Sequence, residues 1–327
     1  MIFNRLRSFY FILILVLVAL SFSRTEIFSG QATDKTIPST GTELPEQLSG
    51  QTYRVSVDLV NVICSVYDDN TNAFVTSLTR EDFDIYEDGE KQTIENFARE
   101  TNMPLTIAML IDTSQSVKPN LQFEQETATS FFHTVLGEKD RAMVVEFDPG
   151  INLVQDFTND PNKLAGKIDD LKAGGLGTKL FDSIYLSCHE KLIRETGRKA
   201  IIILSDGADQ NSNHNIDQAI EMALRAEAII FAVNVTSGSL FGVGDNHEGD
   251  KTLKKLVEET GGRLFAPYKE ELYETFQKIN QELRSQYSIG YTSTNPSRDG
   301  RYRKIEIKVR NGDFKLNYRK GYYAPES

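Results

Sequence analysis

The sequence predicts an α/β protein in which a doubly wound, Rossmann-like domain with a mainly parallel sheet is inserted into a smaller all-β sandwich. Two observations predict this fold. Apolar strand-like runs alternate with helical patterns over residues 103–284, whereas residues 52–102 and 285–327 show strand patterns alone. Each flanking segment is too short to bury a good core by itself. We therefore expect the two segments to pair with each other across the inserted domain, whose ends then lie close together.

The first flanking segment, residues 52–102, contains several short strand patterns and no helical one. Partial alternation of apolar residues predicts a strand from Val55 to Val62 that continues from Ile63 to Tyr67. Turn-forming residues follow at 68–72. Further strands are predicted at 83–86 and at Gln92–Phe97, and the sequence Glu87-Asp88-Gly89 between them is typical of a hairpin turn.

The inserted segment, residues 103–284, contains four strand-like runs, and three of them are nearly continuously apolar. Such runs are typical of a parallel sheet that is buried on both faces. The four strands are predicted at Leu105–Ile111, Ala142–Phe147, Ala200–Leu204 and Ile229–Val235, with an additional antiparallel edge strand at Ile151–Phe157. The predicted helices are Leu121–Val135, Lys163–Leu171, Phe181–Arg194, Asp217–Glu227, Thr252–Glu259 and Glu270–Arg284.

The second flanking segment, residues 285–327, returns to strand patterns. Strands are predicted at Gln286–Thr292, Tyr302–Val309 and Phe314–Tyr318. A tight turn at Asn311-Gly312-Asp313 separates the last two of them.

The N-terminus predicts export from the cytoplasm. Arg5 and Arg7 precede an unbroken apolar run, Phe9–Phe22, which is shorter than the roughly 20 residues that span a bilayer as a helix. Small residues follow, so we expect residues 1–23 to be a secretory signal peptide and residues 24–51 a flexible linker. An uncleaved N-terminus that associates with the membrane or envelope is the alternative. The protein is expected in the periplasm, on the cell surface or in the medium.

Composition excludes some classes of function. The formal net charge of −11 argues against nucleic acid as a partner, because phosphate binding requires a basic surface. Cys64 and Cys188 are expected to be buried free thiols, although export would permit a disulfide between them. The four histidines are scattered and show no zinc-ligand spacing. The oligomeric state is not predicted.

Oxygen-bearing side chains follow the predicted parallel strands, at the edge of the sheet where such folds bind ligands. Asp112, Ser114 and Ser116 follow the first strand in a DxSxS motif, and Asp206 follows the strand Ala200–Leu204. Between them, Thr178 ends a glycine-rich loop. Two carboxylates and three hydroxyls form a hard donor set that suits Mg²⁺, with Mn²⁺ or Ca²⁺ as alternatives. DxSxS alone could be a helix cap, but Thr178 and Asp206 argue against that interpretation.

At these five residues the sequence resembles the von Willebrand factor type A (vWA) family and its metal-ion-dependent adhesion site. The resemblance implies that the metal, held directly or through water, coordinates an Asp or Glu carboxylate of a partner protein. The flanking sequences, residues 78–97, 287–295 and 318–325, resemble the narrower group of exported bacterial vWFA-related proteins. We therefore expect a cation-dependent binding or adhesion module outside the cytoplasm.

Two other functions are the alternatives. One is a structural role in the assembly of an envelope complex. The other is a metal-dependent hydrolase. Two observations argue against it, because no general base is evident beside the five residues and no motif supports a catalytic triad. We expect no enzymatic activity. A phosphate-binding loop at Gly174–Lys179 and a calcium loop at Asp209–Asn215 both lack the required spacing, and the second is interpreted as a solvated loop beside the metal site.

Overall fold

The computed structural model describes residues 59–100, 103–235 and 247–326, all within one compact unit, Val55–Ser327. The predicted signal peptide and linker lie outside the described residues, as does most of the glycine-rich segment 237–250. Within the described residues, no helix is both long and apolar enough to cross a membrane.

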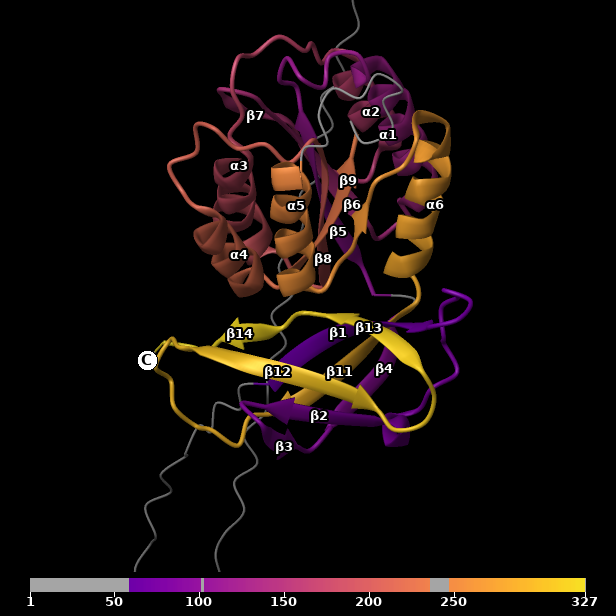
Figure 1. The fold of residues 1–327 in the computed structure, drawn as a ribbon, viewed down its shortest axis with the longest axis vertical. Helices are drawn as coiled ribbons and strands as arrows, with labels where there is room; N and C mark the ends of the chain where they lie inside the picture. Colours follow the sequence, from indigo (N-terminus) through magenta and orange to yellow (C-terminus); the bar gives the residue numbers. More distant parts are fainter. Residues whose placement is uncertain (1–58, 101–102, 236–246, 327) are drawn as a thin grey trace, which may run out of the picture. The chain divides into compact units, whose positions relative to one another are not determined.

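A six-stranded sheet forms the centre of the α/β domain, in the order β10-β9-β8-β5-β6-β7 (Figure 1). All neighbouring strands are parallel except β6 and β7, which are antiparallel. The strands are β5 (Leu105–Asp112), β6 (Arg141–Phe147), β7 (Ile151–Thr158), β8 (Arg198–Ser205), β9 (Ala228–Asn234) and β10 (Leu264–Phe265). The doubly wound fold and the antiparallel edge strand are thus confirmed.

Helices cover both faces of this sheet, so that each face has a separate apolar core. Alternate residues of β5 show the division, because Ile107 and Met109 pack into one core and Ala108 and Leu110 into the other. One face carries α1 (Leu121–Val135), α2 (Pro161–Asp169) and α6 (Leu272–Leu283). The other carries α3 (Leu180–Leu186), α4 (Ile216–Arg225) and α5 (His247–Thr260).

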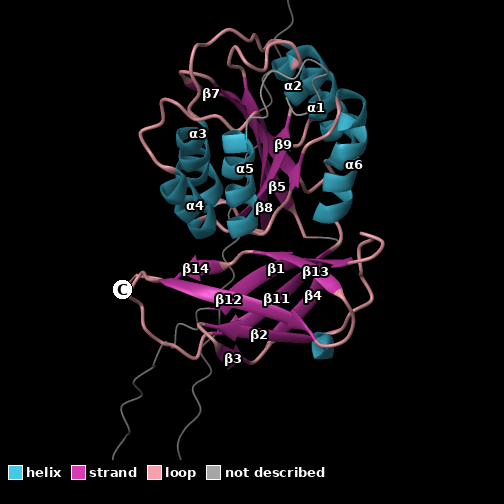
Figure 2. Ribbon diagram, in the orientation of Figure 1, coloured by secondary structure: helices cyan, strands magenta, loops and turns pink. Residues whose placement is uncertain are grey.

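Two four-stranded antiparallel sheets, built from both flanking segments, form the β-sandwich. Figure 2 shows that this part consists of strands, apart from the short 3₁₀ turn Arg80–Asp82. The orders are β13-β1-β11-β4 and β14-β12-β2-β3. The strands are β1 (Leu59–Asp68), β2 (Phe83–Glu87), β3 (Glu90–Gln92), β4 (Asn96–Glu100), β11 (Gln286–Thr292), β12 (Tyr302–Val309), β13 (Phe314–Tyr318) and β14 (Gly321–Tyr323).

Pairing across the inserted domain confirms the predicted β-sandwich. β1 from the N-terminal segment lies between β11 and β13 from the C-terminal one, and Val62 lies opposite Ile289. The core of the sandwich is apolar and aromatic, with Phe83, Tyr287 and Tyr291 among its largest fully buried side chains. Neither segment could bury these groups alone.

Several predicted boundaries are wrong. Gln92–Phe97 is not one strand, because residues 93–95 separate β3 from β4, and these two strands pair in different sheets. The predicted helix Phe181–Arg194 is helical throughout but changes form, from α3 to a π-helix at Ser187–Lys191 and a 3₁₀ turn at Leu192–Arg194. Helix α5 begins at His247 rather than at Thr252. Cys64 and Cys188 are buried and free, as expected.

Candidate functional site

Four of the five predicted site residues lie at or just after the carboxyl ends of two adjacent parallel strands, and the fifth, Thr178, lies on the glycine-rich loop before α3. β5 ends at Asp112 and pairs with β8, which ends at Ser205, next to Asp206. On its other side β5 pairs with β6. The strands that follow β5 in sequence, β6 and β7, extend the sheet on one side, and the later strands β8, β9 and β10 extend it on the other. This is the topological switch point, where open α/β sheets bind their ligands.

Asp112 forms the buried base of the site. One carboxylate oxygen accepts a hydrogen bond from the backbone N–H of Ser114 at 2.9 Å, and the other accepts one from the Ser205 hydroxyl at 2.6 Å. Burial raises the pKa of Asp112 to about 6, although these hydrogen bonds act in the opposite direction. The side chain is therefore fixed in place, and its charged form requires further stabilisation.

The two serines of the motif lie together on the loop that follows β5. Their hydroxyl oxygens, Ser114 Oγ and Ser116 Oγ, are 3.0 Å apart. The backbone of this loop is joined to the glycine-rich loop, because Gln115 N–H donates to the Gly175 carbonyl at 3.0 Å and Gly174 N–H donates to the Thr113 carbonyl at 3.1 Å. Two loops that are far apart in sequence thus meet at one point.

Thr178 and Asp206 complete the group from the other side. The Thr178 carbonyl accepts hydrogen bonds from the N–H groups of Gln210 and Asn211, at 3.0 and 3.2 Å. This contact draws the glycine-rich loop against the loop that follows β8. Gly177 is required there, because its φ is +106° and a Cβ would lie 2.3 Å from the Asn211 side-chain nitrogen.

A pocket of about 660 Å³ lies where these loops meet. It is lined by Ser114, Ser116, Thr178 and Asp206, together with Phe181, Asp209 and Glu248. Leu176, whose residue is 82% exposed, also lines it. Among the described residues that line the pocket, none is a lysine or arginine. The structure therefore brings four of the five predicted residues to one negatively charged pocket, while Asp112 is fully buried and does not line it.

The loop Asp209–Asn215 beside this pocket is held by Asp182. This carboxylate accepts hydrogen bonds from the backbone N–H groups of Asn213 and His214 at 3.0 Å, and lies 2.6 Å from the His214 ring. Although burial opposes it, these bonds lower the pKa of Asp182. The predicted solvated loop is thus anchored at this end.

Two residues of the site were not predicted. Ser205 supports Asp112, and a hydroxyl directly before Asp206 was its only signal in the sequence. Glu124 is buried in the first turn of α1. Its negative charge interacts with the charges of Asp112 and Asp206. In the sequence, the indication of this role was that Glu124 falls on the apolar face of the helix, between Leu121 and Ala128.

The donor set fits a hard divalent cation. Carboxylate and hydroxyl oxygens are the ligands that Mg²⁺ prefers, and no nitrogen or sulfur ligand is among the five residues. Within the described part of the chain, no group of three or more His, Cys, Asp or Glu side chains could hold a metal. Any cation at this pocket would therefore depend on the serine and threonine hydroxyls.

Comparison with known proteins agrees with the fold. Residues 107–208 match the family model of the von Willebrand factor type A domain. This match includes β5, β6 and β8 and all five predicted site residues. The chain therefore contains a von Willebrand factor type A domain. A search of curated proteins found no match.

Solved structures with a similar arrangement come from several organisms. An aerotolerance-related membrane protein from Bacteroides fragilis NCTC 9343 aligns with 55% of this chain and 98% of its own, at 14% identity and a TM-score of 0.44. The vWF domain of the type V pili tip protein Mfa5 from Porphyromonas gingivalis aligns with 55% and 94%, at 16% identity and 0.45. Proximal thread matrix protein 1 from the mussel byssus, with a zinc-occupied MIDAS motif, aligns with 60% and 49%, at 16% identity and 0.46.

Proposed function

We propose that this protein is a cation-dependent binding module outside the cytoplasm, in which Asp112, Ser114, Ser116, Thr178 and Asp206 hold one Mg²⁺ ion. The ion coordinates an Asp or Glu carboxylate of a partner protein. The single observation that carries this proposal is that Ser114, Ser116, Thr178 and Asp206 line one pocket at the switch point of the sheet, where the buried Asp112 is bonded to Ser114 N–H. Export is proposed from the N-terminal sequence alone.

The charge of the pocket supports dependence on a cation. Asp206, Asp209 and Glu248 line it, and no described lysine or arginine lining it offsets them. A partner carboxylate that enters this pocket alone is repelled. A bound divalent cation reverses this interaction, because it neutralises the carboxylates of the site and offers a coordination position.

The pocket also suits a ligand larger than a single ion. Leu176 is exposed at its rim, beside the glycine-rich loop, and an exposed apolar side chain at a binding site commonly contacts a partner. No group in the pocket is arranged as a nucleophile with an adjacent base. The site thus favours binding over catalysis.

Substitution of Asp112 tests the proposal. We expect Asp112→Ala and Asp112→Asn to weaken Mn²⁺ binding by about 100-fold or more, because each removes the buried carboxylate on which the site is built. The measurement is a titration of the full chain with Mn²⁺, in which electron paramagnetic resonance reports the free ion. Asp170→Ala, at an exposed aspartate that follows α2, is the matched control and should bind Mn²⁺ as the wild type does.

Acetate then serves as a minimal carboxylate probe. We expect the Mn²⁺-loaded wild type to enhance the relaxation of the acetate methyl protons, and the Asp112 variants to lose this effect. Circular dichroism should show that the variants retain the fold. Binding of Mn²⁺ by folded Asp112→Ala with wild-type affinity contradicts the proposal.

A further inference from the structure

Glu124 is a buried carboxylate that has no hydrogen-bond partner. Its residue is 1% exposed, and neither side-chain oxygen has a partner among the described residues. Its backbone is ordinary, because Glu124 N–H donates to the Asn120 carbonyl at 3.0 Å as expected in the first turn of α1. Most buried polar atoms in folded proteins have a partner, so this side chain requires an explanation.

Helix α1 places Glu124 close to the candidate metal site. The helix begins at Leu121, soon after the loop of Ser114 and Ser116, and the side chain of Asn120 donates to the Val235 carbonyl at 2.7 Å. Leu121 of the same helix packs in the same apolar core as Ile111 of β5 and Leu204 of β8, and the charge of Glu124 interacts with those of Asp112 and Asp206. Together with burial, these two negative charges raise the pKa of Glu124 to about 8.

No feature in the described part of the protein compensates this carboxylate. Burial and the two aspartates all disfavour its charge, and no cationic side chain contributes in the opposite direction. The first turn of a helix favours a negative charge, but this effect is small compared with the penalty for burying an ion. The protonated form also lacks a partner, because its hydroxyl would need an acceptor that the neighbouring side chains of the apolar core do not offer.

We propose that Glu124 is an outer carboxylate of the cation site, and that its negative charge strengthens cation binding without ligating the ion. The proposal rests on the proposed function, since it assigns to the cation the positive charge that Glu124 lacks. The acidic side chains here do not form a cluster that could ligate a metal together, so Glu124 contributes charge, directly or through water. Groups outside the first coordination shell commonly change metal affinity by about 10–100-fold.

This assignment has a consequence for the ligand-free site. Among the five proposed ligands, Asp112 and Asp206 balance the two positive charges of the ion, and Glu124 adds a further negative charge. The site therefore retains its cation before a partner carboxylate arrives. The same excess makes the bound ion a weaker acceptor for that carboxylate, so that cation affinity rises at the expense of partner affinity.

Substitution of Glu124 by glutamine tests the inference. We expect Glu124→Gln in the full chain to bind Mn²⁺ at least about tenfold more weakly than the wild type. Glu124→Asp, which keeps the charge, should bind more tightly than Glu124→Gln. Glu126→Gln is the matched control, because Glu126 is exposed on the same helix and its change should leave Mn²⁺ affinity unaltered.

Thermal unfolding in EDTA separates this role from a structural one. Glu124→Gln and the apolar variant Glu124→Met should melt no lower than the wild type, because each removes a buried carboxyl group for which the described part of the metal-free fold offers no partner. Unfolding of both variants in EDTA overturns the inference. Wild-type Mn²⁺ affinity in Glu124→Gln, with loss of binding in Asp112→Ala, overturns the inference alone. Mn²⁺ binding by Asp112→Ala overturns the proposed function.

Discussion

Each of the two carboxylate oxygens of Asp112 accepts a hydrogen bond. The donors are Ser114 N–H, from the loop, and Ser205 Oγ, from the end of β8. Ser205 Oγ in turn accepts a hydrogen bond from Gly207 N–H at 3.1 Å. The carboxylate is thus oriented by the protein itself, and little conformational entropy has to be lost when an ion binds.

The buried Glu124 predicts how stability depends on pH. Its pKa in the folded protein is about 8, above the usual 4.5, so its contribution to stability is complete below pH 4.5 and is lost as pH rises through 8. In EDTA, we expect the free energy of unfolding to fall between pH 6 and 8, by at most about 1.4 kcal/mol per pH unit. Urea unfolding at several pH values measures this slope.

Glu124→Gln is the comparison that isolates this effect, because it should remove most of the slope above pH 6. Asp112 does not confuse the comparison, since its pKa of about 6 confines its contribution to lower pH, between 3.8 and 6. An equal slope in both proteins would show that Glu124 is charged in the metal-free fold.

The sequence predicted the residues of the site that carry a local motif and missed those that act from a distance. Asp112, Ser114 and Ser116 are spaced for one loop, and Thr178 and Asp206 follow in known contexts. Glu124 reaches the site only because α1 packs against the ends of β5 and β8. No spacing rule connects a helix residue to two strands, and its role depends on tertiary packing alone.

At the scale of elements, long apolar strands were predictable and short paired ones were not. β5 and β8 are buried at every position, so their sequences are unambiguous. β10 has two residues, Leu264–Phe265, and β14 has three, Gly321–Tyr323. Such strands exist because a neighbouring strand supplies hydrogen bonds, and this information is absent from their own sequences.

The end of helix α5 predicts a strong effect of one methyl group. Gly261 follows the helix with φ of +86°, and a Cβ there would lie 2.4 Å from the backbone of Tyr318 and Arg319. We expect Gly261→Ala to lower the free energy of unfolding by about 1–3 kcal/mol from the backbone conformation alone, with a further loss from the clash. Urea denaturation followed by circular dichroism measures the change.

Gly166→Ala is the matched control for this prediction. Gly166 lies inside α2, and a Cβ there would have no atom within 4 Å. Alanine should therefore stabilise the protein by about 0.5–1 kcal/mol, because glycine weakens a helix interior. If Gly261→Ala were as stable as the wild type, the close approach of α5 and β13 would be wrong.

At the scale of the whole chain, the inserted domain enters and leaves the sandwich at neighbouring points that are fastened together. Asp140 accepts a hydrogen bond from Leu105 N–H at 2.8 Å, near the entry, and forms an ion pair with Arg284, at the exit. Arg319 of the sandwich region donates to the Asn61 carbonyl at 2.7 Å and lies 3.6 Å from Glu227 of the α/β domain. The change from strand-only to alternating patterns predicted the insertion, but these contacts required the structure.

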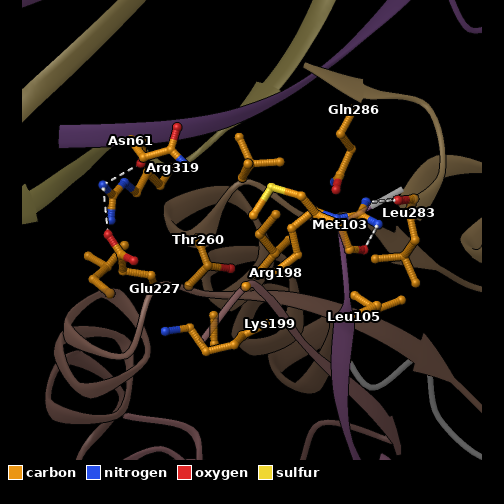
Figure 3. Close-up of a pocket in the computed structure, with 15 residues that line it drawn as sticks. Asn61, Met103, Leu105, Arg198, Lys199, Glu227, Thr260, Leu283, Gln286 and Arg319 are labelled. Carbon is orange, nitrogen blue, oxygen red and sulfur yellow. Dashed lines mark hydrogen bonds and ion pairs between the residues drawn. The ribbon is translucent and has the colours of Figure 1, made fainter. Parts of the chain in front are cut away.

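Arg198 joins the two ends of the inserted domain most directly, and its loss should affect the whole molecule. Its buried guanidinium donates to the carbonyls of Leu283, at the end of α6, and of Met103, just before β5, beside a small pocket of about 50 Å³ (Figure 3). We expect Arg198→Ala to lower the free energy of unfolding by about 3 kcal/mol, because two charge-assisted hydrogen bonds are lost and the buried Leu283 carbonyl is left without this donor.

Arg198→Lys should have an intermediate effect, since one ammonium group cannot reproduce the planar arrangement of donors. Arg301→Ala, at a side chain that is 84% exposed, should be nearly neutral.

Urea unfolding can be followed by circular dichroism, which reports the helices of the α/β domain, and by tyrosine fluorescence, which includes the sandwich residues Tyr287 and Tyr291. The chain contains no tryptophan that would obscure the tyrosine signal. The two transitions should coincide in the wild type and separate in Arg198→Ala, because this arginine couples the domain to the strands on both sides of it. Coincident transitions and wild-type stability in Arg198→Ala would show that Arg198 does not couple the two parts.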